Sequence, residues 1–104
     1  MGKCFLCKPR YMTRGIAERL PVSMQIQLWS YIDNKSADTE LDYLQVFEFE
    51  KNNRKLKIIH SQEMPEEFRD EHEIIVADNV ATPAEKIFVI DDETHCTMLW
   101  ASEY

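Results

Sequence analysis

The sequence predicts an α+β domain in which one main helix, over residues 21–34, packs on a mostly antiparallel sheet of five or six strands. Only one segment repeats apolar residues at helical spacing, whereas several shorter segments alternate apolar and polar residues with the period of a strand. Turn-forming residues separate these segments. With 104 residues, 44% of them hydrophobic, the chain has the size of one domain with its own core.

The N-terminal residues 1–9 are expected to form a loose leader, and residues 10–104 a single domain. Pro9 interrupts regular structure, and the strand-like pattern begins only after it. Residues 10–14 have the composition of a short strand. Gly15 then permits a turn that a residue with a Cβ would resist.

The main helix is predicted to begin at Pro21, because proline suits the first helical position. Apolar residues follow at helical spacing. Three of them form a stripe along the helix that we expect to face the core: Val22, Ile26 and Trp29. A polar run after residue 32 ends the helix and leads into the predicted sheet.

Two hairpins are predicted in the second half of the chain. In residues 41–50, successive side chains fall on alternate faces with the period-two pattern of a strand. Residues 51–54 supply a turn in which asparagine tolerates a positive φ, and residues 55–62 form the returning strand. Residues 66–73 are expected to interrupt the sheet because they are charged, with a short strand at 74–77. The second hairpin joins residues 86–90 to 97–101.

Charge and cysteine content favour some classes of protein and disfavour others. The net charge is −7, divided into +4 over residues 1–20 and −11 over residues 21–104, and such an acidic surface repels nucleic-acid phosphate. No apolar run approaches the roughly 20 residues of a membrane-spanning helix. Three cysteines cannot all pair within one chain. We therefore expect a cytoplasmic protein that does not bind membrane, and nucleic-acid binding is disfavoured unless the basic N-terminal segment forms a local patch.

The cysteines suggest a zinc site, because Cys4 and Cys7 have the spacing of one of the two ligand pairs that such a site needs. Cys96, beside His95, with His60 or His72, would complete the ligands. Adjacent strand residues point to opposite faces, however, so the competing interpretation is a loose leader plus one packed thiol. No cofactor is predicted.

An enzymatic or metal-dependent centre is the alternative hypothesis for function, since four residues of the right chemical types occur: His60, Asp91, Asp92 and His95. No nucleophile elbow, zinc-binding helix motif or phosphate-binding glycine loop accompanies them. The acidic run at residues 91–93 is more typical of a solvated hairpin turn.

A second alternative is a binding site for single-stranded nucleic acid, formed by Arg10, Tyr11 and Arg14, which interleave two guanidinium groups with an aromatic ring. The competing interpretation is that the arginines pair internally with some of the 19 carboxylates.

The leading hypothesis is a non-enzymatic module for protein–protein interaction or regulation. Tyr43, Phe47 and Phe49 lie on one face of a predicted strand, and Leu44 and Val46 lie on the other. A single helix covers one sheet face only, so an apolar face is expected to stay open for a protein partner or a second copy. Arg10, Tyr11 and Arg14, together with the three strand aromatics, are the predicted contact residues.

Several segments resemble a family known as domain of unknown function 960, found in staphylococci and related Gram-positive bacteria: 10–16, 27–33, 41–47, 57–63, 89–92 and 99–104. The resemblance implies a cytoplasmic bacterial protein of about this length. It brings no activity, cofactor or functional residue. Cys4 and Cys7 lie outside the similar segments.

Overall fold

The computed structural model describes residues 8–77, 81–83 and 85–104. Six strands form one sheet in the order β1-β6-β5-β2-β3-β4. Their bounds are β1 Arg10–Met12, β2 Leu44–Asn52, β3 Lys55–Gln62, β4 Phe68–Ile75, β5 Ile87–Asp91 and β6 Cys96–Trp100. All pairings are antiparallel except that of β1 with β6. The predicted α+β class and strand count are confirmed.

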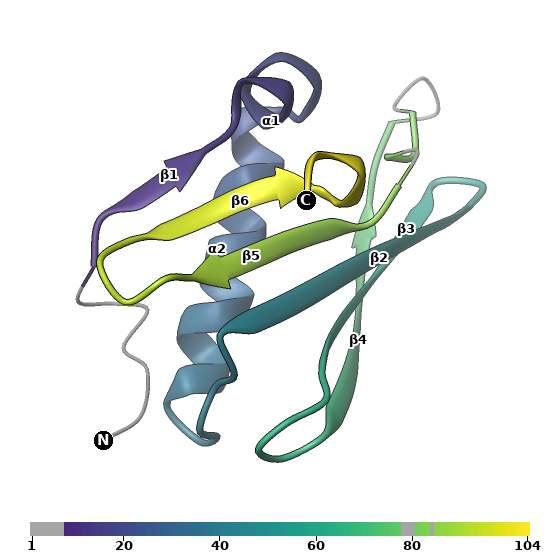
Figure 1. Ribbon diagram of the computed structural model, residues 1–104. Coiled ribbons are helices and arrows are strands. Elements are labelled where there is room, and N and C mark those ends of the chain that lie inside the picture. Colours follow the sequence, from purple (N-terminus) through teal and green to yellow (C-terminus); the bar gives the residue numbers. More distant parts are fainter. Residues whose placement is uncertain (1–7, 78–80, 84) are drawn as a thin grey trace.

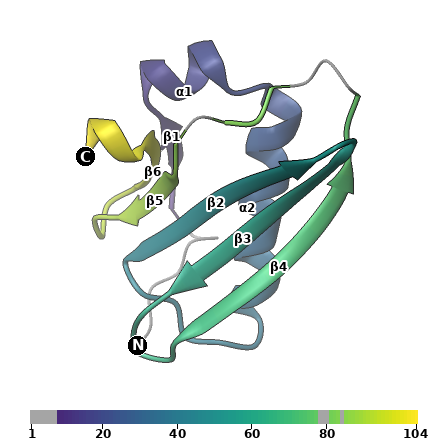
Figure 2. The same ribbon diagram turned by 90° about the vertical axis from the view of Figure 1, so that its right-hand side faces the viewer.

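In the described part of the chain two α-helices accompany the sheet: α1, Arg14–Arg19, and α2, Val22–Ser36, with the short 3₁₀-helix η1, Ala101–Glu103, after β6. Figures 1 and 2 place α2 along one side of the sheet, which we call the inner face; the opposite side is the outer face. Side chains of α2 contact β4 directly, because the Tyr31 and His72 rings stack 3.8 Å apart. Neither α1 nor α2 covers the outer face.

The core lies between α2 and the inner face. Leu28 and Ile32 of α2 are fully buried in the same cluster as Phe47 and Ile58 of the sheet. The predicted stripe is wrong in part, because Val22 is 67% and Ile26 63% exposed. The buried residues of α2 are instead Met24, Gln25, Leu28, Tyr31 and Ile32, a face rotated from the predicted one.

Both predicted hairpins form. In the first, Asn52 pairs with Lys55 and Asn53 adopts a φ of 59°, as expected of asparagine in a two-residue turn. In the second, Ile87 pairs with Trp100 and Asp91 with Cys96. Asp92 organises that turn, since its Oδ1 accepts from the backbone N–H of Thr94 and of His95.

Two local predictions are corrected. The charged segment 66–73 does not interrupt the sheet, because Phe68–Ile75 forms edge strand β4, whose outward positions tolerate charge. Gly15 is not a turn residue either, since it lies inside α1. A Cβ at Gly15 would stand 2.7 Å from the Glu103 carboxylate, which accepts hydrogen bonds from Thr13 and the Trp100 backbone.

Candidate functional site

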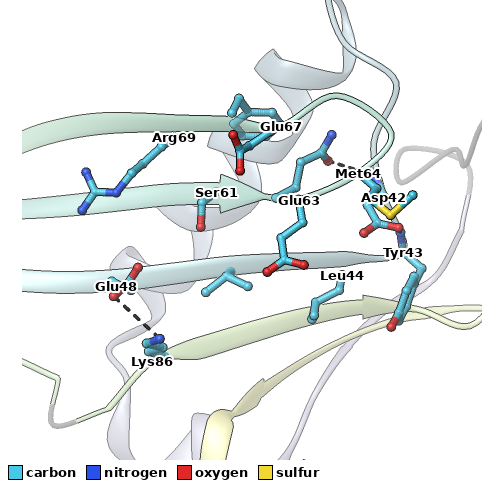
Figure 3. Close-up of a pocket in the computed structure, with 13 residues that line it drawn as sticks. Asp42, Tyr43, Leu44, Glu48, Ser61, Glu63, Met64, Glu67, Arg69 and Lys86 are labelled. Carbon is cyan, nitrogen blue, oxygen red and sulfur yellow. Dashed lines mark hydrogen bonds and ion pairs between the residues drawn. The ribbon is translucent and has the colours of Figure 1, made fainter.

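A hollow of about 870 Å³ lies on the outer face, and we call it the outer hollow. It lies over β2 and β3, between the chain segment leading into β2 and the β3–β4 connection (Figure 3). Its lining residues are Asp42, Tyr43, Leu44, Val46, Glu48, Ser61, Gln62, Glu63, Met64, Glu67, Phe68, Arg69 and Lys86.

The alternation of β2 gives the outer hollow an apolar floor. Leu44 and Val46 point outward because Gln45 and Phe47, the residues between and beyond them, are buried on the inner face. The floor continues across the sheet, since Leu44 pairs with Ile90 and Val46 with Phe88. These four outward side chains form what we call the apolar row, and all four are only half-buried.

The other half of the outer face is covered by its own charged side chains. Ile59 also points outward but is 1% exposed. Its partners across the neighbouring strands are Glu48 and Glu71, and Lys57, two residues away on the same face, lies 3.6 Å from the Glu71 carboxylate. The aliphatic stems of such side chains shield apolar surface while their charged ends stay in water. The apolar row is less completely covered, because all four of its side chains stay partly exposed although the Lys86–Glu48 pair flanks one end of it.

Polar groups surround the floor of the outer hollow. Four carboxylates and two cations belong to its lining: Asp42, Glu48, Glu63, Glu67, Arg69 and Lys86. Lys86 lies 3.8 Å from Glu48, and Arg69 lies 2.9 Å from Glu71, outside the hollow. Figure 3 shows Glu63 reaching from the end of β3 toward Leu44, with Glu48 and Lys86 toward the opposite end.

A buried polar trio on the inner face holds the segments that frame the hollow. Gln45 and Gln62 bond to each other at 2.7 Å, and His60 Nε2 lies 2.6 Å from Gln45 Oε1. Gln62 also accepts from the Asp42 backbone N–H and donates to the carbonyls of Glu40 and Glu66. The trio therefore ties the segment before β2 to the segment after β3.

His60 is a neutral member of that trio. Because the Gln45 amide nitrogen donates to Gln62, its oxygen must accept, so His60 Nε2 carries the proton. Burial disfavours the charged ring and lowers the pKa of His60 from 6.5 to about 4. Phe47 stacks on the ring at 4.6 Å and Phe68 contacts it edge-on at 5.0 Å. At neutral pH His60 is a structural hydrogen-bond donor.

The role assigned to the strand aromatics needs correction. Phe47 is fully buried and Phe49 packs against the core, because both lie on the inner face below α2. Only Tyr43, 45% exposed, reaches the surface, where it lines the outer hollow. On the opposite face of β2, the apolar side chains of Leu44 and Val46 stay partly exposed.

The basic segment is largely engaged within the molecule. Arg10 donates to the Asp33 carboxylate from both terminal guanidinium nitrogens, Nη1 and Nη2, and stacks over Trp29 at 4.7 Å. Arg14 pairs with Glu18 at 2.9 Å on α1. Tyr11 is 55% exposed and contacts the His95 ring edge-on. Arg10 and Arg14 thus have the internal carboxylate partners of the competing interpretation.

The four residues of the enzymatic alternative are not brought together. His60 lies across β2 from Ile87, and Asp91 is four residues further along β5, so sheet geometry separates their Cα atoms by roughly 16 Å. Asp91 is buried against Lys8 at 2.6 Å, whereas Asp92 shapes the exposed β5–β6 turn and pairs with His95 at 3.1 Å. No catalytic cluster is proposed from them.

The zinc hypothesis concerns residues that the structure does not place. Cys4 and Cys7 lie outside the described residues. Cys96 is a free thiol in the core, and burial raises its pKa to about 11, which disfavours the thiolate that binds metal. Over residues 8–77, 81–83 and 85–104, no group of three potential ligands could hold a metal ion.

The outer hollow was not found by sequence reasoning, although part of its signal was present. Gln45 and Gln62 share the strand parity of buried Phe47 and Ile58, which marks them as core amides. Glu63 and Glu67 line the hollow from the β3–β4 connection, at the end of the sheet where β2 begins at Leu44.

Comparisons with known proteins give a family and a shared fold. A family model described as "Staphylococcal protein of unknown function (DUF960)" matches residues 9–103, which confirms the resemblance seen in the sequence. The crystal structure of a protein of unknown function from Enterococcus faecalis is similar, with a TM-score of 0.78 and 27% identity over 100% of this chain and 98% of that one. No curated protein matches the chain. No helix in the described part of the chain has the length and apolarity to cross a bilayer.

Proposed function

Because the chain belongs to DUF960, a family of staphylococcal proteins of unknown function, we propose its role from its surface: a non-enzymatic module that binds another protein through the outer face of its sheet. The observation that carries the proposal is the apolar row of Leu44, Val46, Phe88 and Ile90, which neither α1 nor α2 covers and which runs into the outer hollow. At the far end of the row the Tyr104 ring contacts Phe88 edge-on at 5.6 Å. Contiguous apolar surface of this kind is typical of docking sites.

A heterologous partner fits better than a second copy. Stacking two outer faces would bring together two carboxylate-rich rims from chains that each carry a net charge of −7. Like charges across an interface oppose association. If the chain associates with itself instead, light scattering will show a dimer, and Val46→Glu will abolish that dimer. This result would identify the partner as a second copy of the chain.

An enzymatic role has less support, since the residues proposed for it serve local structure. His60 belongs to the buried trio, Asp91 pairs with Lys8, and Asp92 caps a turn. The proposal places the module in the bacterial cytoplasm, where a free thiol such as Cys96 stays reduced.

Photo-crosslinking tests the docking face directly. A p-benzoylphenylalanine installed at position 46 in the native bacterium is expected to give a defined crosslinked protein, because its ring would stand over the apolar row. The matched control carries the same group at position 26, an exposed apolar residue on α2. The captured protein is then purified, and its affinity for the wild-type chain and for Val46→Glu is measured by calorimetry.

The expected result is a crosslink at position 46 that is weak or absent at position 26, and binding that Val46→Glu reduces at least about tenfold. Equal capture from both positions, or unchanged affinity of the folded Val46→Glu variant, would contradict the proposal. Circular dichroism establishes that the variant is folded.

A further inference from the structure

The outer hollow is divided between an apolar floor and an acidic wall, and this division limits what it can bind. Leu44 and Val46 form the floor, and the lining has four carboxylates against two cations, a net charge of −2. Both cations already have carboxylate neighbours, Lys86 beside Glu48 and Arg69 beside Glu71. The surplus negative charge is therefore not neutralised by the cations of the hollow itself.

Two of those carboxylates are available to a partner. Among the described residues, Glu63 and Glu67 have no ion-pair partner, and both side chains are exposed. Figure 3 shows the Glu63 carboxylate close to Leu44, so an incoming cation would stand beside the apolar floor. Asp42, near the same end, uses one oxygen to accept from the Tyr43 backbone N–H.

We propose that the outer hollow receives a peptide segment that carries a Lys or Arg next to an aliphatic side chain, the aliphatic group resting on Leu44 and Val46 and the cation beside Glu63 and Glu67. This inference rests on the docking function proposed above and names the chemistry of its partner. A volume of about 870 Å³ lies in the range of sites that enclose a small ligand or several side chains.

The same charge distribution argues against other macromolecules. Nucleic acids present phosphates, and bacterial membrane surfaces are anionic, so either would be repelled by the acidic wall. A basic, partly apolar protein segment is the class that matches both the floor and the wall.

Three synthetic peptides test the inference: acetyl-Lys-Leu-Lys-Leu-Lys-amide, its Glu-for-Lys counterpart, and its Ser-for-Leu counterpart. Binding to the ¹⁵N-labelled chain is followed by amide shifts, with Val46 and Ser61 as reporters. Only the first peptide is expected to shift both reporters in a saturable way, because only it supplies charge and aliphatic contact together.

Matched variants locate the cation. Glu63→Gln combined with Glu67→Gln is expected to weaken binding of the first peptide about tenfold, since each exposed ion pair contributes about threefold. The control Glu73→Gln, which removes an outward carboxylate of β4 outside the hollow, is expected to change affinity less than twofold. Equal binding of the acidic peptide, or an equal effect of Glu73→Gln, would overturn the inference.

The two proposals fail in different ways. If none of the peptides shifts Val46 or Ser61, yet position 46 still captures a partner whose binding Val46→Glu abolishes, the docking function stands and the basic-segment inference is overturned. If the crosslinker at position 46 performs no better than at position 26, the docking function itself fails.

Discussion

The two faces of the β2–β3 hairpin use neighbouring residues for opposite purposes. On the inner face, Gln45, His60 and Gln62 are buried and bonded to one another. On the outer face, one residue away along the same strands, Val46 is half-covered, and Glu63, just beyond the end of β3, has no ion-pair partner among the described residues. Buried polar groups need partners for the chain to be stable, whereas exposed ones are free to bind something else. The inner-face residues therefore stabilise the fold, whereas the outer-face residues are available to contact a partner.

The largest expected effect comes from breaking the inner face. Phe47→Ala removes a fully buried ring and is expected to destabilise the protein by about 3–5 kcal/mol. The substitution Val46→Ala, at the neighbouring position on the opposite face, should lower the free energy of unfolding by less than about half of that amount. Urea unfolding measures both. Equal losses would mean that the outer face is as tightly packed as the inner one.

Acidification should weaken the inner face through His60. The pKa of His60 is 6.5 when unfolded and about 4 when folded, so the unfolded chain binds the proton more tightly. The contribution of neutral His60 to the free energy of unfolding is complete above pH 6.5. It is lost progressively as the pH falls to about 4, and the total loss is roughly 3 kcal/mol.

That loss is measured as the difference in pH dependence between variants. His60→Leu should flatten the unfolding free energy between pH 6.5 and 4 relative to wild type. His95→Leu, at the half-exposed ring of the β5–β6 turn, should keep the slope. An identical slope in His60→Leu would rule out His60 as its source.

Removing the central amide of the trio should loosen the frame of the outer hollow. Gln62→Leu strips partners from Gln45 and from the backbone of Glu40, Asp42 and Glu66, which we expect to cost about 2 kcal/mol. Hydrogen exchange of the Asp42 amide should accelerate. Ser61→Ala, the neighbouring outward position, is the control and should leave that exchange rate unchanged.

The smallest expected change in stability comes from removing a charged side chain that covers part of the outer face. Lys57→Ala should change stability by less than about 1 kcal/mol but should uncover Ile59. Increased binding of the dye ANS, which reports exposed apolar surface, checks this. Unchanged dye binding would mean that other side chains alone cover Ile59.

Local regularities were read correctly from the sequence. Asn53 and the alternating residues on either side of it predicted the first hairpin, and the residues around Asp92 predicted the second. The main helix was predicted at 21–34 and is observed at Val22–Ser36. These features depend on contacts between residues close in sequence, so a local pattern is sufficient to indicate them.

Long-range features were not predictable in the same way. Strand β4 carries charge because it lies at the sheet edge, and nothing local to residues 66–73 indicates an edge. The buried face of α2 was misassigned for a similar reason, since Val22 and Ile26 have the composition of a core stripe but point away from the sheet.

By itself the sequence determined the fold class, the two hairpins, the main helix and the acidic surface, because each follows from composition or from contacts between near neighbours. Only the tertiary structure decided which strand face α2 covers, and hence that Phe47 serves the core while Leu44 and Val46 stay open. A strand pattern of period two defines two faces but does not say which one is buried. That choice follows from where the helix packs, a contact between segments far apart in the chain.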